Sequence, residues 1–321
     1  MKCTIKRMTQ TLLCVLILTT SVFGRELIPG GQIVGLELCD QRVVVAGFDE
    51  EQGKSAQAAG LKSGDIIQKI DDTVIASAED IRTALKHSDG TVTLQISRDG
   101  QVQSLQIVPH ITQDGPRLGV YLRQGIAGIG TVTWYDPESD TFATLGHGVN
   151  DGSGKLLKMT SGKAYRARVM TVKKGKIGEP GQLIGAIKSP EPVGELYRNT
   201  QQGVFGKYSE EPQGQAIPIA QMGEVKTGDA VIRSTIEGET PREYSVKILK
   251  IYPKTRDNGR NLLLRVTDPA LLEATGGIVQ GMSGSPIIQN GKLVGAVTHV
   301  LVNDPTTGYG IFVENMLDAA A

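Results

Sequence analysis

A serine set among small residues is the strongest sign of chemistry in this sequence. Ser283 lies in Gly-Met-Ser-Gly-Ser-Pro, residues 281–286, between two short apolar runs. Small residues on both sides of a serine allow backbone N–H groups to converge on one point, which an oxyanion hole requires. We therefore predict Ser283 as a nucleophile, with the amides of Gly281 and Ser283 as oxyanion donors. Ser285 stands where the G-x-S-x-G elbow of α/β-hydrolases has glycine, so that elbow is excluded and Ser285 is interpreted as a turn residue. A plain Gly/Ser-rich hairpin is the alternative.

A serine nucleophile needs a base, and the chain has four histidines. His147 lies in Leu-Gly-His-Gly-Val, residues 145–149, directly after a predicted strand, so its ring should be exposed at the end of that strand. It precedes Ser283 by 136 positions. This order and distance suit a peptidase of two β-barrels in which each barrel contributes part of the site, and they predict His147 as the base. A structural histidine in a turn is the alternative.

The acid that would orient this histidine is less well marked. Asp268 follows a predicted strand 15 residues before Ser283, but Glu191, Glu195 and Asp229 also lie between the histidine and the serine. Spacing alone does not choose among them.

A second histidine, His299, lies on an apolar run 16 residues after Ser283. A two-barrel peptidase has a strand of its specificity pocket at this position. We expect His299 to contribute to the substrate pocket, and a core histidine bonded to backbone groups is the alternative.

The composition indicates a mainly β protein that is not a nucleic-acid binder. The 321 residues include 40 glycines and only 4% aromatic residues, with many short β-branched runs between turn signals. Lys plus Arg equals Asp plus Glu at 34 each, and no basic cluster with interleaved aromatics is present. Of three cysteines, only Cys39 lies beyond the N-terminal segment, so we expect no disulfide framework, no metal site and no cofactor.

The first 24 residues predict export. Lys2, Lys6 and Arg7 precede an uncharged run from Met8 to Gly24, which is typical of a signal peptide. Its length is near the lower limit for crossing a bilayer, so a retained membrane anchor is the alternative.

Residues 28–109 read as one small domain. A glycine loop enters an alternating strand at Ile33, and the stretch Ala-Gly-Leu-Lys-Ser-Gly-Asp-Ile-Ile, residues 59–67, gives a turn and a strand. A helix capped by Ser77 and a hairpin at Asp99-Gly100 follow. The segment resembles a PDZ domain of the kind associated with bacterial proteases. This resemblance implies peptide binding as an added strand; the residues expected to do so are Ile33, Val34, Gly35, Leu36, Ile81 and Leu85.

After a polar stretch at 110–117, predicted as a linker, residues 118–321 consist of short strands with dense turn signals. Roughly 200 residues of this kind predict a double β-barrel or a sandwich.

Taken together, the N-terminal segment, the PDZ-like domain, Leu-Gly-His-Gly at 145–148, Gly-Met-Ser-Gly-Ser-Pro at 281–286 and Thr-His-Val-Leu-Val-Asn-Asp-Pro at 298–305 resemble the SpoIVB peptidases of endospore-forming bacteria. The resemblance implies a chymotrypsin-like double barrel after the PDZ domain, with Ser283 as nucleophile and His147 as base. The family's acid carries over to Asp268, which lies much farther from the histidine in sequence than the acid of chymotrypsin does.

The same resemblance implies a role in endospore formation. Such proteins cross the forespore membrane, cleave themselves near the N-terminus, and cleave a membrane-bound regulator to activate the intramembrane protease that matures sigma-K. The PDZ domain is implied in targeting or autoregulation, and the apolar tail at 316–321 is a candidate ligand for its groove. A non-catalytic PDZ scaffold at the forespore membrane is the alternative, whereas a general quality-control protease of the HtrA kind is disfavoured because the PDZ domain precedes the catalytic segment here.

Overall fold

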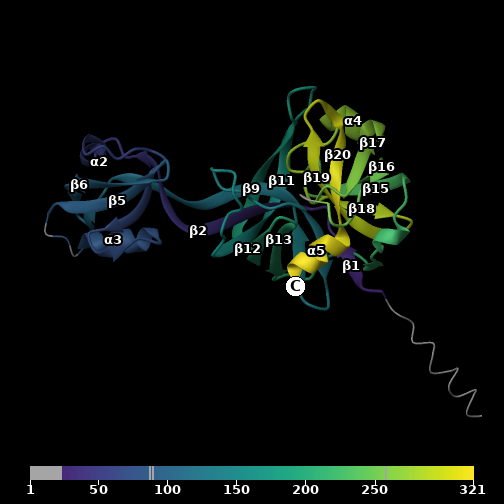
Figure 1. The fold of residues 1–321 in the computed structure, drawn as a ribbon, viewed down its shortest axis with the longest axis horizontal. Coiled ribbons are helices and arrows are strands. Elements are labelled where there is room, and N and C mark those ends of the chain that lie inside the picture. The colour runs from purple at the N-terminus through teal and green to yellow at the C-terminus, as the bar shows by residue number, and fades with distance from the viewer. Residues whose placement is uncertain (1–23, 87, 89, 257–258) are drawn as a thin grey trace, which may run out of the picture.

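The computed structural model describes residues 24–321 except 87, 89, 257 and 258. Two bodies of unequal size are joined by a long two-stranded ribbon (Figure 1). The predicted signal segment lies outside the described residues apart from Gly24. Within the described part, no helix is long and apolar enough to cross a membrane.

The first barrel of the larger body is a ring of six strands. Each strand is hydrogen-bonded to the next one in the ring. The ring closes because the first and last strands pair with each other, with Ile33 opposite Thr131. Val34, Leu36 and Val204 pack together in one buried cluster, as expected for the inward face of alternating strands. The strands in order are β9 (Val120–Asp136), β10 (Thr141–Thr144), β13 (Gly203–Tyr208), β12 (Gln182–Thr200), β11 (Ser161–Lys173) and β2 (Ile33–Phe48). Two short strands, β1 (Glu26–Pro29) and β14 (Ile217–Pro218), extend the sheet beside β9.

The second barrel is also closed and has six strands, so the prediction of a mainly β chain with a double barrel is confirmed. Its interior is apolar, with Ile232, Leu264 and Val297 fully buried. The strands in order are β15 (Gly228–Ser234), β16 (Arg242–Ile251), β17 (Leu262–Val266), β20 (Asp304–Phe312), β19 (Lys292–Leu301) and β18 (Pro286–Gln289). The 3₁₀ turn η1 (Met222–Glu224) and the helices α4 (Pro269–Thr275) and α5 (Val313–Ala320) complete this part.

The smaller body is the PDZ domain. Several details match the sequence predictions: Ser77 Oγ caps the helix at Asp80 N (3.2 Å), and Asp99 and Gly100 both have positive φ in a tight hairpin. Its elements are α2 (Lys54–Ala58), β3 (Ile66–Ile70), β4 (Thr73–Val74), α3 (Ala78–Lys86), β5 (Val92–Arg98), β6 (Gln101–Ile107), β7 (His110–Thr112) and β8 (Gly115–Arg117).

An ion pair in the PDZ core explains the acidic residue of the 59–67 stretch. Burial alone would raise the pKa of Asp65, but Arg98 donates to both of its oxygens at 2.7 Å and Lys62 N donates at 2.8 Å. The pKa of Asp65 is lowered as a result. A buried carboxylate needs such partners, so this residue ties the turn before β3 to the end of β5.

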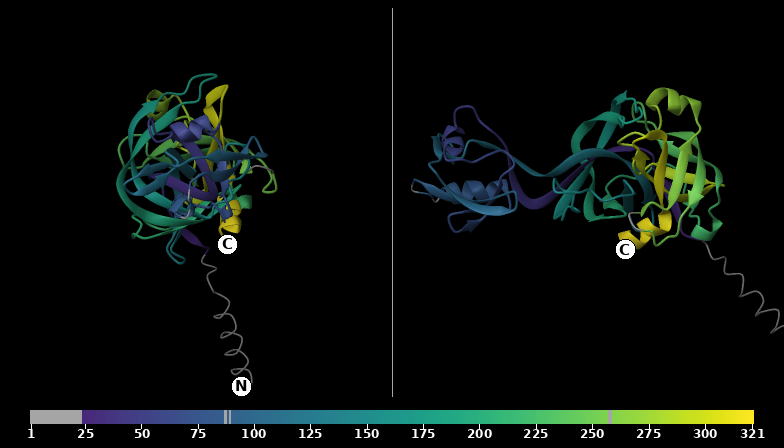
Figure 2. Two further views of the ribbon diagram at one scale, coloured as in Figure 1. Left: turned by 90° about the vertical axis from the view of Figure 1, so that its left-hand side faces the viewer. Right: turned by 45° about the horizontal axis from the view of Figure 1, so that its top comes forward.

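The boundary of the PDZ domain differs from the one predicted. The first half of β2 pairs with β11 and β9 in the first barrel, with Gly35 opposite both Tyr165 and Ile129. The chain leaves the barrel along β2 and returns along β9, as the right-hand view of Figure 2 shows. The PDZ domain is therefore inserted between two neighbouring strands of the barrel, and the stretch 110–117 forms the β7–β8 hairpin in place of a linker.

The C-terminal tail packs against the first barrel. Residues 313–320 form α5, in which Met316 is fully buried. Tyr197 Oη donates to Ala320 O at 3.2 Å and Arg198 Nη1 donates to Ala319 O at 3.1 Å. In this structure the tail is thus held against the first barrel and not in the PDZ groove.

Candidate active site

His147 is presented by a strained turn at the end of β10. Leu145 and Gly146 both have left-handed backbone conformations, with φ of 71° and 67°. The leucine is buried, and this conformation is unfavourable for a bulky side chain unless packing enforces it. A Cβ on Gly146 would lie 2.9 Å from Thr298 Cγ2, so only glycine lets this turn approach the second barrel. The turn places His147 at the junction of the two barrels.

The hydrogen bond of the His147 ring fixes its tautomer. Nδ1 lies 3.0 Å from Gly148 O. A carbonyl oxygen can only accept, so the proton is on Nδ1 and the lone pair is on Nε2. Burial lowers the pKa of His147 below its ordinary value, although the bond to Gly148 acts in the opposite direction. The ring is therefore a neutral base with Nε2 available.

Ser283 lies in the turn before β18, and the first barrel holds that turn in place. Thr131 of β9 donates its N–H to Ser283 O at 3.0 Å and its hydroxyl to Gly281 O at 2.8 Å. The hydroxyl of Ser283 donates to Thr298 O at 2.8 Å and is not hydrogen-bonded to His147. Catalytic hydrogen bonds are often incomplete in a free enzyme.

The two predicted oxyanion donors are free. Among the described residues, neither Gly281 N nor Ser283 N donates a hydrogen bond within the protein. The peptide planes that carry them are fixed through their carbonyls: Gln280 O accepts from Leu183 N at 2.8 Å, and Met282 O accepts from Ser285 N at 3.0 Å. Two fixed, unpaired N–H groups beside a serine are what an oxyanion hole requires.

Ser285 has a structural place in the same turn. Its side chain is fully buried, and its hydroxyl donates to Met282 O at 2.7 Å. Its Oγ also lies 3.0 Å from Ser234 Oγ. The hydroxyl therefore reinforces the peptide plane that presents the Ser283 N–H.

His299 lies next to His147. Their ring centroids are 5.2 Å apart and the ring planes are tilted by 42°. The Nδ1 atom of His299 is buried without a hydrogen-bond partner. Burial, with His147 and Arg260 nearby, lowers the pKa of His299 to about 4, so this ring is neutral at physiological pH. The structure brings His299 to the site but leaves its role in the substrate pocket a prediction.

The structure does not support Asp268 as the acid of the site. Asp268 is the N-cap of α4: its carboxylate accepts from Leu271 N at 3.0 Å and from Ser245 N at 3.3 Å. It makes no hydrogen bond or ion pair with His147. No carboxylate among the described residues bonds to that histidine, and a backbone carbonyl orients it in place of an acid. Asp229, which also lies between His147 and Ser283 in the sequence, forms an ion pair with Lys247, with 3.8 Å between Oδ1 and Nζ.

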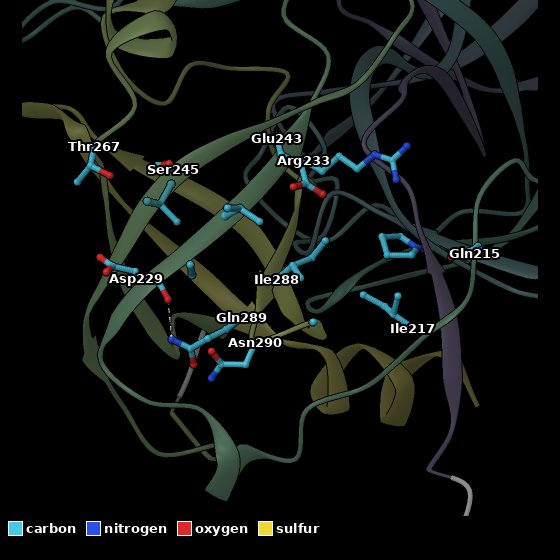
Figure 3. A pocket seen from close by; sticks show the side chains of 15 residues that line it. Gln215, Ile217, Asp229, Arg233, Glu243, Ser245, Thr267, Ile288, Gln289 and Asn290 are labelled. Atoms are coloured by element: carbon cyan, nitrogen blue, oxygen red, sulfur yellow. Dashed lines mark hydrogen bonds between the residues drawn. The ribbon is translucent and has the colours of Figure 1, made fainter.

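A surface hollow of about 900 Å³ lies on the outside of the second barrel and is separate from this site (Figure 3). Arg233 of β15 and Glu243 of β16, which are direct cross-strand partners, lie on its wall. Neither Ser283 nor His147 lines it. The volume of a hollow therefore does not identify the candidate active site of this protein.

The peptide groove of the PDZ domain differs from the predicted one. Val34, Gly35 and Leu36 are paired on both sides in the first barrel, and Ile33 is paired with Thr131 of β9. This part of β2 therefore belongs to the barrel and does not bind a PDZ ligand. A hollow of about 610 Å³ instead lies between α3 and the start of β9. It is lined by Ile81 and Leu85, as expected, together with Leu118, Val120 and Leu122.

The start of β9 has the features of a ligand-binding strand. Residues 120–122 pair with β2 along one edge, and no other described strand pairs with them. Gly119 precedes them with φ of 67°, and its carbonyl accepts from Asp49 N at 2.8 Å. The sequence contains a signal for this strand, because Leu-Gly-Val at 118–120 directly precedes an apolar strand. In a PDZ domain that is contiguous in sequence these residues would belong to the next domain.

Two closed β-barrels with a histidine and a serine at their junction define a chymotrypsin-like serine peptidase, here with an inserted PDZ domain. The model of the SpoIVB peptidase S55 family matches residues 114–317, and that of the PDZ domain matches residues 33–108. The chain belongs to the SpoIVB peptidase S55 family and is a serine endopeptidase.

The matches to individual proteins are more distant. No curated protein matches the chain. Among solved structures, the inactive form of the Rv3671c protease has 16% identity and a TM-score of 0.34, covering 60% of this chain and 82% of that one. The active form of the same protease, from M. tuberculosis, has 17% identity and a TM-score of 0.37, covering 60% and 73%.

Proposed function

We propose that Ser283 is the nucleophile and His147 the general base of this peptidase. The observation that supports this best is the junction itself, where a neutral histidine with a free Nε2 and a serine beside two unpaired N–H groups come from opposite barrels. His147 removes the Ser283 proton as Oγ attacks the substrate carbonyl, and then donates it to the leaving amine. Water resolves the acyl-enzyme by the same route in reverse.

The oxyanion that forms during attack is bound by the amides of Gly281 and Ser283. Each donor of this kind contributes about 3 kcal/mol to stabilising the transition state. The positive charge that develops on His147 is stabilised by the Gly148 carbonyl, to which Nδ1–H donates. In this mechanism the carbonyl performs the orienting role that a carboxylate has in a triad.

We further propose that the substrate is a membrane-bound regulator of an intramembrane protease, cleaved during endospore formation after export across the forespore membrane. Cleavage of this chain near its own N-terminus belongs to the same proposal, as does maturation of sigma-K as the outcome. Membership of the SpoIVB peptidase family supports these assignments. The PDZ domain, inserted in a barrel that carries the histidine, suits a role in targeting or autoregulation.

Labelling with a serine-reactive phosphonate tests the catalytic assignment. The native chain should be labelled and Ser283→Ala should not, while Ser285→Ala should still be labelled because its nucleophile remains. Equal labelling of the native and Ser283→Ala chains would refute the proposal.

Reconstitution tests the substrate. The purified chain is added to vesicles that carry the membrane-bound regulator, and the regulator should be cut by the native chain and left intact by Ser283→Ala. A chain that is labelled by the phosphonate but leaves the regulator uncut would retain the catalytic assignment and refute the substrate.

A further inference from the structure

The loop that joins β11 to β12 carries an unusual concentration of positive charge. Residues 173–181 read Lys-Lys-Gly-Lys-Ile-Gly-Glu-Pro-Gly, with three lysines and one acid in a chain whose total charge is zero. Lys173, Lys174 and Lys176 are all exposed. None of the three forms an ion pair within the part of the chain that the structure describes. Their charge is therefore available to a partner.

An apolar residue lies at the apex of this basic loop. Lys176 and Glu179 exchange backbone hydrogen bonds of 2.9 Å each, and Gly178 has φ of 81°, so Ile177 is held at the tip of a tight turn. Its side chain is 80% exposed. Exposing an isoleucine side chain to water is unfavourable, and the free energy of the protein falls when a partner covers this side chain.

More exposed apolar side chains lie around the tip. Gly178 N donates to Val302 O at 2.9 Å, which places the turn between β19 and β20 beside the basic loop at the top of Figure 1. Val302 is 47% exposed. In the two strands that the loop joins, Met170 of β11 is 55% exposed and Ile184 of β12 is 47% exposed. The one acid in the neighbouring turn, Asp304, is already bonded to the hydroxyls of Thr306 and Thr307 at 2.6 Å each.

We propose that this tip, residues 173–181 with Val302, docks on an anionic lipid bilayer. Lysines near such a surface are attracted by its negative potential, while an apolar side chain that protrudes among them enters the boundary between head groups and acyl chains. An acidic peptide would pair with the lysines but would leave the projecting Ile177 in water. The convex shape of a two-residue turn suits a flat bilayer better than an extended peptide.

The base of the loop is hydrogen-bonded to the segment that leads into the nucleophile turn. Gly175 N donates to Thr275 O at 2.8 Å, and Gln280 N donates to Gly181 O at 2.9 Å. Docking of the tip therefore holds Gly281 and Ser283 at a short distance from the bilayer. Such an arrangement favours cleavage close to a membrane anchor, and this part of the inference depends on the proposed membrane-bound substrate.

Vesicle flotation tests the docking itself without relying on catalysis. A chain of residues 24–321, which contains every described element and lacks the apolar leader, is used as Ser283→Ala. It should float with phosphatidylcholine vesicles that contain about one third phosphatidylglycerol, not with phosphatidylcholine alone, and less so as salt is raised. The triple change Lys173→Gln, Lys174→Gln, Lys176→Gln should weaken this binding at least tenfold.

Two further variants complete the test. Lys54→Gln, Lys62→Gln, Lys69→Gln removes three exposed lysines of the PDZ domain and should bind as the parent does. Ile177→Trp should show a blue-shifted emission on the charged vesicles, and Ile177→Ser should bind several-fold more weakly. Equal binding by the loop and PDZ lysine variants would overturn the proposal. Capture by polyglutamate without vesicle binding would also overturn it, and would assign the loop to an acidic protein.

An activity measurement separates this inference from the proposed function. With Ser283 intact, the Lys173/Lys174/Lys176 variant should keep the parent rate on a soluble peptide and lose several-fold on the same peptide anchored to charged vesicles. A parent that is inactive on both peptides while still floating with vesicles would refute the proposed function and retain the docking site.

Discussion

Arg42 and Asp151 are joined across the neck between the PDZ domain and the first barrel. Arg42 Nη1 lies 2.9 Å from Asp151 Oδ2, and Arg42 Nε lies 2.5 Å from Asp40 Oδ2 on the same strand. Asp151 in turn organises the loop that follows His147, since it accepts from Ser153 N at 2.8 Å and Lys155 N at 3.2 Å. The strand that carries the PDZ domain is thereby connected to the loop that follows His147.

Replacing Arg42 should therefore affect catalysis from outside the active site. Arg42→Gln leaves the buried Asp40 and the partly buried Asp151 without their cation, and we expect kcat on a soluble peptide to fall about fivefold. Arg82→Gln, which breaks an exposed pair within the PDZ domain, is the matched control and should leave kcat unchanged. Unchanged kcat and unchanged hydrogen exchange over residues 149–157 in Arg42→Gln would show that the link is not used.

Asp268 should matter for stability and not for chemistry. Asp268→Ala removes the N-cap of α4 and should lower the free energy of unfolding by about 1 kcal/mol. Asp268→Ser keeps a capping oxygen but no carboxylate, so it should recover most of that stability with kcat near the native value. Urea unfolding and peptide hydrolysis measure the two quantities. A folded Asp268→Ser that has lost catalysis by three orders of magnitude would restore this residue as the acid.

The contrast between Ser283 and Asp268 shows what local sequence can establish. The tight turn at Ser283 can be predicted because its proposed function depends on backbone geometry, which the small residues at 281–286 encode directly. Asp268 followed by Pro269 also has a local meaning, since Asp at the N-cap with Pro at the first helical position is a start signal for a helix. The family resemblance instead implies that Asp268 is the catalytic acid. The structure shows the helix that the local signal indicates.

The insertion of the PDZ domain could not be read from the sequence. β2 supplies alternating apolar residues to the barrel at Val34 and Leu36 and then to the PDZ core at Val43 and Val45. The alternation changes phase between Leu38 and Val43, where Asp40, Gln41 and Arg42 intervene and the register with β9 shifts. A short polar stretch of this kind is also typical of a turn within one domain, so by itself it does not mark where one domain ends. The barrel is completed only when β9 returns about 90 residues later, which is a non-local fact.

The acid limb of the pH profile should lie below the ordinary range of histidine. Burial lowers the pKa of His147, and the reaction needs its neutral form. As pH falls, kcat/KM should therefore persist below pH 6.5, the unperturbed value, and decline only once the ring takes up a proton. A limb at or above pH 6.5, measured with a neutral peptide, would contradict the buried environment of His147.

Ser285 should support catalysis without being the nucleophile. Its hydroxyl donates to Met282 O, the carbonyl of the peptide whose N–H, that of Ser283, is the proposed oxyanion donor. Ser285→Ala loses one buried hydrogen bond, of about 1 kcal/mol, and we expect a roughly five- to tenfold lower kcat with little change in KM. Ser234→Ala removes only the outer hydroxyl contact and should have a smaller effect. If Ser285→Ala lost all phosphonate labelling while remaining folded, the assignment of the two serines would have to be reversed.

His299 should act mainly through the ring that it presents to His147. An aromatic pair at 5.2 Å contributes about 0.5–1.5 kcal/mol, so His299→Asn should lower kcat up to tenfold, whereas His299→Phe keeps a ring and should stay within about threefold of the native value. KM should change little in both. A peptide library provides the opposing readout, because a residue of the substrate pocket alters which side chain is accepted before the scissile bond. A changed preference with intact kcat in His299→Asn would therefore return His299 to the pocket role that its sequence position predicts, and would leave Gly148 O as the one group among the described residues that orients His147.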